Sequence, residues 1–429
     1  QDGLLADMAM ADLAVQAAPS PTDGRIAYAQ NREDQSDLWL HTETGERRLT
    51  SEGIMAMRYG RGDQQWLSWA PDGSAVAFLS AEGTLSTVDT ETGEVEELTH
   101  HNGPDIGLAW GEHGIGLVTN AVSRAALTLV DPETSSLQVL ADDDHLYSDP
   151  RWGEDGLYAV RARHRDLFDY ESALVRVPLE DGQLTGEVET LFHEEGVRVQ
   201  NPRPHPHGDG VAFVHDANGF DELSYADGPA VEAAAGAQTS VQTQTVHAED
   251  ETEIADPAWH PDGDKLAATA TQQGRVNSRV VTLDGDVVDS SEGDEKHSAP
   301  FWLDGEVYSV RGTPTNPPQV WNASAGEAAV PSGSVGFEER LAAPTELTFE
   351  QGDHEIHTIV YPPGGGFPEE ADSVPLLVHP HGGPTAFDDF GWDYRSQYFA
   401  ALGYAVAMPN YRGSDGYGRA HRNANHDDW

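Results

Sequence analysis

The chain has 429 residues, which is enough for two or three domains. It contains 74 Asp and Glu residues but only 24 Lys and Arg residues, so its formal net charge at pH 7 is −50. This charge excludes binding to nucleic acid phosphates or to anionic membrane surfaces, and the absence of Cys excludes disulfides, thiolate metal sites and a cysteine nucleophile.

The acidic residues are spread along the whole chain, and only two of the basic residues are lysines, Lys265 and Lys296. This composition is typical of halophilic proteins, in which carboxylates hold hydrated cations and molar salt screens their repulsion. No apolar run approaches the 18 residues of a membrane-spanning helix, and no basic-then-apolar leader opens the chain. We therefore expect a halophilic, cytoplasmic protein with solvent cations on its acidic surface and no membrane partner.

A leading helix is expected within residues 1–17, because residues 4–15 are good or tolerable helix formers. From residue 18 onward a short pattern recurs, in which a turn of the Pro-Asp-Gly type separates two apolar strands. Asp-Gly permits the positive φ angles of a tight hairpin. The turn glycines recur every 41 to 54 residues, at Gly24, Gly73, Gly114, Gly156, Gly210, Gly263 and Gly305.

Most of these repeats carry a second hairpin downstream, so each repeat is predicted to contain four strands. A period of this length with four strands is typical of a β-propeller blade. The seven repeats therefore predict an all-β, seven-bladed propeller over residues 18–341.

Residues 342–429 follow a different pattern. Strands are predicted at 345–351 and 354–361, and two buried strands at 374–379 and 404–409 flank a helix at 393–402. The apolar face of this helix is predicted to carry Tyr394, Tyr398, Phe399 and Leu402. Apolar strands separated by a helix indicate a parallel sheet, so this region is expected to begin an α/β domain.

Two motifs of this region carry a resemblance to a known family. His-Gly-Gly-Pro at 381–384 and the run from Gly403 to Gly418, with Asn-Tyr-Arg-Gly-Ser at 410–414, resemble the prolyl oligopeptidase family of serine peptidases, and the acylaminoacyl-peptidase and dipeptidyl-aminopeptidase branch above all. In that family a propeller precedes an α/β-hydrolase domain. The resemblance implies that residues 342–429 are the incomplete N-terminal portion of the hydrolase domain.

Paired glycines after a strand let backbone N–H groups point into an open cleft, where they can stabilise a developing oxyanion. By its match to the family motif, Gly383 is the expected oxyanion donor, with Gly382 beside it and His381 where some relatives carry a contributing Tyr. Tyr411 and Arg412 are expected at the mouth of the active site or in a structural turn, and the residues favour the turn.

The catalytic triad is expected to be absent from this chain, because no Ser stands in a Gly-x-Ser-x-Gly nucleophile elbow. In the family the elbow follows the Tyr-Arg-Gly-Ser turn by some tens of residues, so we expect a chain truncated before it. Ser414 and Ser334 come nearest to the motif, and His421 and His426 precede the place where the catalytic His is expected.

The remaining candidates have weaker signals. Glu194 and Glu195 could hold a substrate amine, as paired propeller glutamates do in dipeptidyl peptidases of this family, but acidic pairs are frequent in this chain. The pairs His205/His207 and His379/His381 have no third ligand at an obvious spacing, so no metal site is predicted. No cofactor is expected either.

The sequence thus predicts the N-terminal part of a serine peptidase that acts on short peptides, with the propeller controlling substrate access. Two alternatives remain open: a TolB-like propeller that binds or scaffolds other molecules, and an esterase on the same hydrolase fold. The sequence is compatible with an oligomer and does not fix one.

The charge generates the first prediction. The Debye length is about 30 Å at 0.01 M salt and about 3 Å at 1 M, so the repulsion within a body of charge −50 is screened only at high salt. We expect the thermal midpoint, followed by circular dichroism at pH 7, to climb between 0.05 and 3 M KCl. A midpoint that stays flat or falls across this range would contradict the halophilic interpretation.

Overall fold

The structure is a computed structural model. It describes residue 8 and residues 11–32, 35–54, 65–99, 106–119, 125–163, 171–181, 183–208, 210–227, 242–333, 338–352, 354–364, 366–367, 374–383 and 385–425.

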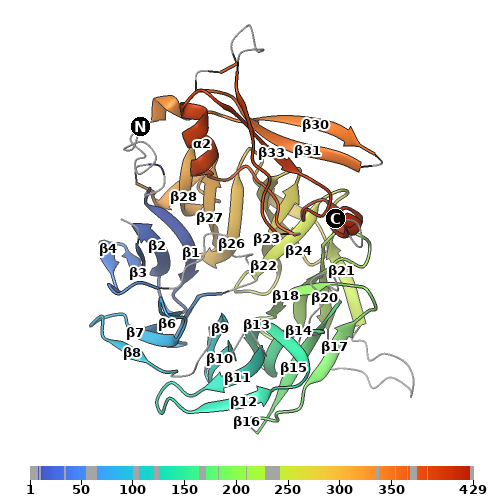
Figure 1. Cartoon of the computed structure of the whole chain (residues 1–429). Coiled ribbons are helices and arrows are strands. Elements are labelled where there is room, and N and C mark those ends of the chain that lie inside the picture. Colours follow the sequence, from blue (N-terminus) through green and yellow to red (C-terminus); the bar gives the residue numbers. More distant parts are fainter. Residues whose placement is uncertain are drawn as a thin grey trace.

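Antiparallel sheets occupy most of the chain between residues 13 and 330 (Figure 1). The first three sheets contain β1 (Leu13–Pro19), β2 (Ile26–Arg32), β3 (Gln35–Thr42) and β4 (Gly45–Arg48); β5 (Leu67–Trp69), β6 (Ala75–Leu79), β7 (Leu85–Asp89) and β8 (Val95–Glu97); and β9 (Ile106–Gly111), β10 (Gly114–Thr119), β11 (Ala126–Val130) and β12 (Leu137–Ala141).

Two further sheets follow, and then a large sheet made of two antiparallel groups joined by one parallel bridge between Val276 and Lys296. Their strands are β13 (His145–Gly153), β14 (Gly156–Arg163), β15 (Ser172–Glu180), β16 (Gln183–Leu184) and β17 (Glu189–His193); β18 (Val199–Pro204), β19 (Val211–His215), β20 (Glu222–Asp227) and β21 (Gln242–His247); and β22 (Glu253–Trp259), β23 (Lys265–Gln272), β24 (Arg275–Thr282), β25 (Val287–Ser290), β26 (Lys296–Leu303), β27 (Glu306–Thr313), β28 (Asn316–Asn322) and β29 (Glu327–Val330).

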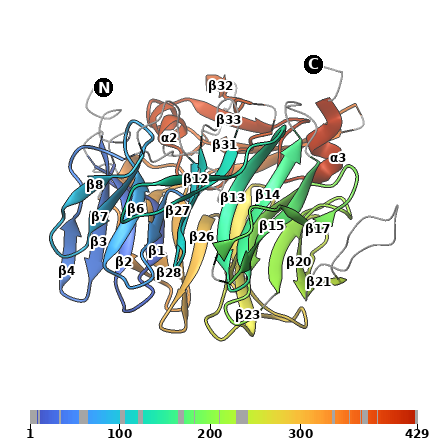
Figure 2. The same ribbon diagram turned by 90° about the horizontal axis from the view of Figure 1, so that it is seen from below.

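These sheets are arranged around a ring, as in a β-propeller (Figures 1 and 2). The strand that opens each group of strands contacts the one that opens the next, in the order β1, β5, β9, β13, β18, β22 and β26, and β26 contacts β1. Five of the predicted turn glycines lie between the first and second strands of their group, and the other two, Gly114 and Gly156, are the first residues of the second strand. The predicted positive φ is confirmed at Gly73, Gly114, Gly263 and Gly305, whereas Gly156 is extended with φ +158°. Gly24 and Gly210 do not have a positive φ, so the prediction is wrong for these two turns.

The Trp of the repeat connects neighbouring groups of strands. The Trp69 indole N–H donates to the Ala18 carbonyl at 3.0 Å, and that of Trp302 donates to the Ala258 carbonyl at 3.0 Å. Trp152 and Trp259 repeat the arrangement with carbonyls of β9 and β18. Each indole N–H thus satisfies a main-chain acceptor on the preceding group of strands.

The leading helix expected within residues 1–17 is wrong from Leu13 onward, where β1 begins. This strand pairs antiparallel with β2 from Leu13↔Asn31 to Pro19↔Ile26 and contacts β26 and β28. Pairing with β2 and packing against β26 and β28 therefore override a weak helix propensity. Most of residues 1–10 lie outside the described residues.

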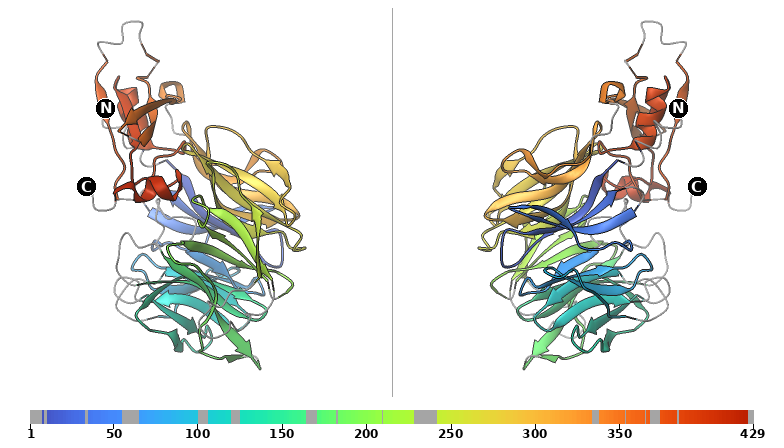
Figure 3. Two further views of the ribbon diagram at one scale, coloured as in Figure 1. Left: turned by 90° about the vertical axis from the view of Figure 1, so that its right-hand side faces the viewer. Right: turned by 90° about the vertical axis from the view of Figure 1, so that its left-hand side faces the viewer.

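The C-terminal elements form one four-stranded sheet in the order β30-β31-β33-β32, with α2 packed against β31 and β33. They are η1 (Glu338–Arg340), β30 (Thr345–Gln351), β31 (His354–Tyr361), β32 (Leu376–Val378), α2 (Tyr394–Ala401), β33 (Ala405–Asn410), α3 (Gly418–Arg422) and η3 (Asn423–Asn425). Figure 3 shows this orange-to-red part lying against one side of the ring. None of the described helices has the length and apolar character needed to cross a membrane.

The predicted parallel pair is confirmed, because β32 and β33 pair parallel from Leu376↔Ala405 to Val378↔Ala407. The burial predicted for the first of these strands is wrong: Leu376 is 61% exposed and Val378 59% exposed. The physical reason is that β32 forms the edge of this sheet and has β33 as its one partner among the described strands.

The helix predicted at 393–402 is confirmed as α2, and Asp393 caps its N-terminus through the amides of Arg395 and Ser396. Of the predicted apolar face, Phe399 packs partly buried against the core of this part, but the fully buried residues of the helix are Ser396, Gln397 and Ala400. Gln397 donates to the carbonyls of Pro314 and Ala342 and accepts from the Ala342 amide. The helix can therefore bury a polar face, because Gln397 forms hydrogen bonds with main-chain groups of the propeller (Pro314) and of the segment that follows it (Ala342).

Two turn glycines of the propeller repeat provide a matched test of sheet-to-sheet packing. Gly263 and Gly305 have similar φ angles of +74° and +79°, but a Cβ on Gly263 would overlap the His205 ring, whereas one on Gly305 would meet nothing within 4 Å. We expect Gly305→Ala to cost roughly 1–2 kcal/mol for its backbone conformation, and Gly263→Ala to cost about 1–3 kcal/mol more for overpacking. Equal losses in urea unfolding of the two variants would contradict this packing.

Candidate active site

The two sequence motifs meet at one edge of the C-terminal sheet. Because β32 and β33 are parallel, the loop after β32 (residues 379–383, here the Gly-Gly loop) and the turn after β33 (residues 410–414) emerge side by side. The carboxyl ends of parallel strands are the usual place for ligand sites in α/β folds.

The 410–414 turn holds the Gly-Gly loop through two side chains. The Tyr411 ring stacks on the His381 ring, with 4.5 Å between centroids and an interplanar angle of 14°. Its hydroxyl donates to the His381 carbonyl at 2.8 Å and lies 3.3 Å from the Gly383 carbonyl. Ser414 Oγ lies 2.7 Å from His381 Nε2. The turn therefore fixes both the imidazole and the main chain that precedes the paired glycines.

The paired glycines present an open stretch of backbone. Gly382 and Gly383 are exposed, and a Cβ on either would meet no atom within 4 Å. Gly383 has φ +73°, a conformation that favours glycine over all other residues. A rigidly held, unobstructed main chain of this kind suits an oxyanion-binding loop, in which backbone N–H groups must be positioned before the charge develops.

His381 lies within the loop as a structural support. Burial lowers the pKa of its imidazole, so the ring is neutral near pH 7. Both ring nitrogens have neighbours, since Nε2 faces Ser414 and Nδ1 lies 3.4 Å from the Gly382 carbonyl. A direct contribution of this ring to oxyanion binding stays a prediction.

Ser414 and His381 have the separation of a nucleophile and its base, but their surroundings do not suit that chemistry. Ser414 is fully buried, and its hydroxyl donates to the Tyr411 carbonyl at 2.6 Å. Since a hydroxyl has one proton to donate, the His381 ring donates to Ser414 rather than accepting from it. This serine therefore ties the loop to the turn. Ser334, the other near match, lies outside the described residues.

Asn410, the first residue of the turn, connects it to the segment after the Gly-Gly loop. Its amide group accepts from the Asp388 amide at 2.7 Å and donates to the Asp388 carbonyl at 2.9 Å and the Tyr417 hydroxyl at 2.7 Å. The carboxyl of Asp388 is itself buried, and burial together with Asp389 and Asp393 raises its pKa to about 8. No local sequence pattern predicts this connection, because the partners of a buried Asn side chain depend on which distant groups the fold brings to it.

Directly after the 410–414 turn, buried charged side chains of the C-terminal part pair with buried charged side chains of the propeller. Arg198 Nη2 lies 2.5 Å from Asp221 Oδ2, and Arg198 Nη1 lies 3.2 Å from Asp415 Oδ2. Arg422 bridges Asp415 at 3.3 Å and also pairs with Asp216. Two propeller aspartates and one turn aspartate thus share two guanidinium groups across the junction.

Glu253, at the start of β22, completes this cluster. Its two carboxylate oxygens accept from the amides of Gly416 at 2.9 Å and Gly418 at 3.0 Å. Burial, followed by the charges of Asp221 and Asp415, raises the pKa of this carboxyl to about 8. We call the six side chains the junction cluster: Arg198, Asp216, Asp221, Glu253, Asp415 and Arg422. Sequence reasoning missed it, because acidic residues are so common here that a buried one carries no distinguishing signal.

The remaining predicted site residues are the Glu194/Glu195 pair of the propeller and Arg412 of the 410–414 turn. Glu194 and Glu195 are exposed in the turn before β18, and the carbonyl of the next residue, Gly196, accepts from Arg419 at 3.1 Å. Their proposed contact with a substrate amine stays a prediction. Arg412 is half-buried in the 410–414 turn.

The histidine pairs make structural contacts. His205 Nε2 lies 3.0 Å from the Gly263 carbonyl and His207 Nε2 lies 2.6 Å from the Pro261 carbonyl, so this pair connects β18 to the neighbouring turn. His421 Nε2 lies 3.0 Å from the Tyr411 carbonyl. Within the described ranges, no group of three or more His, Asp or Glu side chains is placed to hold a metal ion.

Known proteins resemble this chain in sequence near its C-terminal end and in fold along almost its whole length. A model described as the prolyl oligopeptidase family matches residues 390–429. Dipeptidyl aminopeptidase BIII of Pseudoxanthomonas mexicana is 45% identical over 56 residues, which are 13% of this chain and 8% of that protein. The acylamino-acid-releasing enzyme of Rattus norvegicus is 32% identical over 76 residues, 18% of this chain and 10% of that enzyme. The matching segments thus span about a tenth of these relatives.

Solved structures resemble almost the whole chain in fold. A puromycin hydrolase aligns with a TM-score of 0.80 and 19% identity, covering 99% of this chain and 70% of that one. An acylaminoacyl peptidase of Pyrococcus horikoshii aligns with a TM-score of 0.66 and 14% identity, covering 98% of this chain and 68% of that one. The fold is that of peptidases with a propeller before a hydrolase domain. The similarity in sequence to the prolyl oligopeptidase family thus lies in the C-terminal segment.

Because Ser414 is buried and donates its proton to a carbonyl, we predict that a fluorophosphonate probe does not label it in the 429-residue chain. Labelling is measured by mass spectrometry after incubation in molar KCl, with Ser414→Ala as the matched variant. Adduct on one serine that disappears in Ser414→Ala would show that this serine is a nucleophile and would overturn its structural role.

Proposed function

We propose that this chain forms the N-terminal part of a serine peptidase that hydrolyses short peptides. In this proposal the Gly383 amide donates to the oxyanion of the tetrahedral intermediate, and the nucleophilic serine, its aspartate and its histidine belong to a further segment of the hydrolase domain. The observation that carries the proposal is the Gly-Gly loop, open on one side and fixed by Tyr411 and Ser414 on the other.

We also propose that the strands from β1 to β29 are seven blades around a central channel. The closed order of contacts among the seven opening strands supports this count, as do the seven turn glycines at equivalent hairpins. A channel of this kind, with the hydrolase part on one side of the ring, would admit short peptides and exclude folded proteins. An acylaminoacyl, dipeptidyl or oligopeptidase preference is equally compatible with these residues.

The oxyanion role is tested in a protein that carries the complete hydrolase domain. Gly383→Ala places a Cβ on a backbone with φ +73° and displaces the amide, so we expect kcat/KM for a short peptide substrate to fall by about 10²–10³-fold, as after loss of one oxyanion donor.

The matched control for this variant is Gly352→Ala. Gly352 has φ +63° and open space around it, but it lies in the turn between β30 and β31, away from the Gly-Gly loop. The control therefore has the same backbone cost without displacing the amide. Equal rates for the two folded variants would reject the assignment of Gly383, and ester cleavage without peptide cleavage would favour the esterase alternative.

A further inference from the structure

One buried histidine of the C-terminal sheet lies outside the Gly-Gly loop. His357 is 4% exposed and lies on β31 directly opposite Asn410 of β33. The side chains of directly opposite residues leave the same face of a sheet. The Tyr417 hydroxyl lies between these two, 2.8 Å from His357 Nδ1 and 2.7 Å from Asn410 Nδ2. Through this hydroxyl, His357 therefore meets the side chain that begins the 410–414 turn.

The hydrogen bonds around Tyr417 fix where the protons lie. Asn410 Nδ2 donates to the Asp388 carbonyl at 2.9 Å and to the Tyr417 oxygen. The Tyr417 hydroxyl thus accepts from Asn410 and gives its one proton to His357 Nδ1. The ring must then carry its own proton on Nε2, which lies 3.0 Å from Glu346 Oε2. Burial lowers the pKa of His357 and raises that of Tyr417, which favours these protonation states near pH 7.

Arg275 of the propeller meets this chain of hydrogen bonds at both ends. Its guanidinium donates to both carboxylate oxygens of Glu346, at 3.0 Å for Oε2, and this contact lowers the pKa of Glu346 to about 2. The same guanidinium lies 4.4 Å from the centroid of the Phe390 ring, and the Phe390 amide donates to the Gly274 carbonyl at 2.9 Å. Because Phe390 follows Asp388 closely in the chain, the propeller holds the segment after the Gly-Gly loop as well as Glu346.

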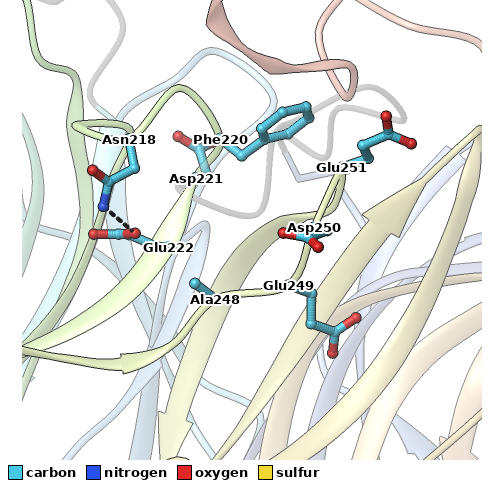
Figure 4. A pocket seen from close by; sticks show the side chains of 8 residues that line it. All are labelled: Asn218, Phe220, Asp221, Glu222, Ala248, Glu249, Asp250 and Glu251. Atoms are coloured by element: carbon cyan, nitrogen blue, oxygen red, sulfur yellow. Dashed lines mark hydrogen bonds between the residues drawn. The ribbon is translucent and has the colours of Figure 1, made fainter.

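The main chain on either side of Tyr417 is fixed by the propeller. Glu253 accepts from the amides of Gly416 and Gly418, and a Cβ on Gly418 would lie 2.8 Å from the Phe220 ring. Figure 4 shows this ring at the edge of a propeller cleft, directed toward the C-terminal ribbon. The Tyr417 side chain therefore has little freedom to move away from its hydrogen-bond partners.

We propose that His357 is a positioning residue for the Gly-Gly loop. By accepting the Tyr417 proton it orients the hydroxyl that meets Asn410 Nδ2. Asn410 in turn binds the main chain of Asp388 in the segment after the loop, and it begins the turn that holds the loop from the other side. The inference rests on the proposed oxyanion role of Gly383, because catalysis depends on the position of the loop only if that amide is used.

The first test measures this position without catalysis. Hydrogen–deuterium exchange of the 429-residue chain is followed by mass spectrometry in molar KCl, for peptides that contain the Asp388 amide, which donates to Asn410 Oδ1 at 2.7 Å. His357→Leu removes the acceptor of the Tyr417 proton, so we expect the Asp388 amide to exchange about 10-fold faster, as after the loss of one buried hydrogen bond. His357→Asn places a side-chain oxygen near the position of Nδ1 and should restore slow exchange.

The matched control is His247→Leu. His247 is 8% exposed on β21, and its Nε2 lies 2.9 Å from Glu249, which accepts from Arg279. It thus has the same Arg-Glu-His arrangement within the propeller, where its loss should leave exchange at Asp388 unchanged. Unchanged exchange in folded His357→Leu, or equally fast exchange in His247→Leu, would overturn the proposal.

A second pair of variants covers the case in which His357→Leu does not fold. Tyr417→Phe removes only the hydroxyl oxygen and should accelerate exchange at Asp388 to a similar extent. Its control is Tyr158→Phe, because Tyr158 is 1% exposed and its hydroxyl donates to Asp155 at 2.8 Å within the propeller. Exchange at Asp388 that is as slow in Tyr417→Phe as in Tyr158→Phe would also overturn the proposal.

The catalytic test uses a protein that carries the complete hydrolase domain. We expect His357→Leu to lower kcat for a short peptide by about 10-fold with little change in KM, since a displaced oxyanion donor affects the transition state more than the bound substrate. His357→Asn should recover most of this loss. An unchanged kcat in His357→Leu, when Gly383→Ala lowers the rate, would overturn the positioning role. Faster exchange at Asp388 with an unchanged rate in Gly383→Ala would instead support the positioning of the loop and reject the oxyanion assignment alone.

Discussion

The attachment of the 415–422 segment to the propeller depends on the pairing of buried charges across the junction. Arg198 belongs to the propeller and Asp415 to the turn that follows β33, and their side chains meet where both are almost fully buried. Desolvating such a pair is expensive, so it contributes little net stability compared with an apolar contact. Removal of one partner, however, typically costs about 3–5 kcal/mol, because the other charge is left uncompensated. The cluster therefore fixes how the two parts fit rather than how tightly they adhere.

The candidate active site is connected to this junction through consecutive residues. Asp415 pairs with Arg198, and its neighbour Ser414 contacts His381 directly before the paired glycines. The Asn410 side chain connects the same turn to the segment around Asp388. A displacement of the turn would therefore move the Gly-Gly loop, and the position of the Gly383 amide depends on propeller residues far away in the sequence. Through this connection the propeller contributes to the position of the candidate site, in addition to the control of access that we propose for it.

The acidic composition has two different consequences in this molecule. On the surface, carboxylates such as those of Asp250 and Glu251 are solvated, and salt screens their repulsion. In the junction cluster, water is excluded and screening is weak, so the pKa of Glu253 is raised to about 8. Carboxylates on the surface therefore stay charged and hydrated, whereas those in the junction cluster are neutralised by arginine or by a proton.

The sequence by itself determined the local elements of this protein. Asp-Gly turns set the hairpins, because glycine adopts positive φ at little cost, and the paired glycines with their flanking strands indicated the loop that carries the candidate site. Only the tertiary structure decided which surfaces these elements bury. Leu13–Pro19 is a strand because it pairs with β2 and packs against β26 and β28. The helix α2 buries Gln397 because the side-chain amide of this residue donates hydrogen bonds to the carbonyls of Pro314 and Ala342. The junction cluster could not be predicted, since a carboxylate's partner and pKa depend on burial and on residues up to 217 positions away, which no local pattern records.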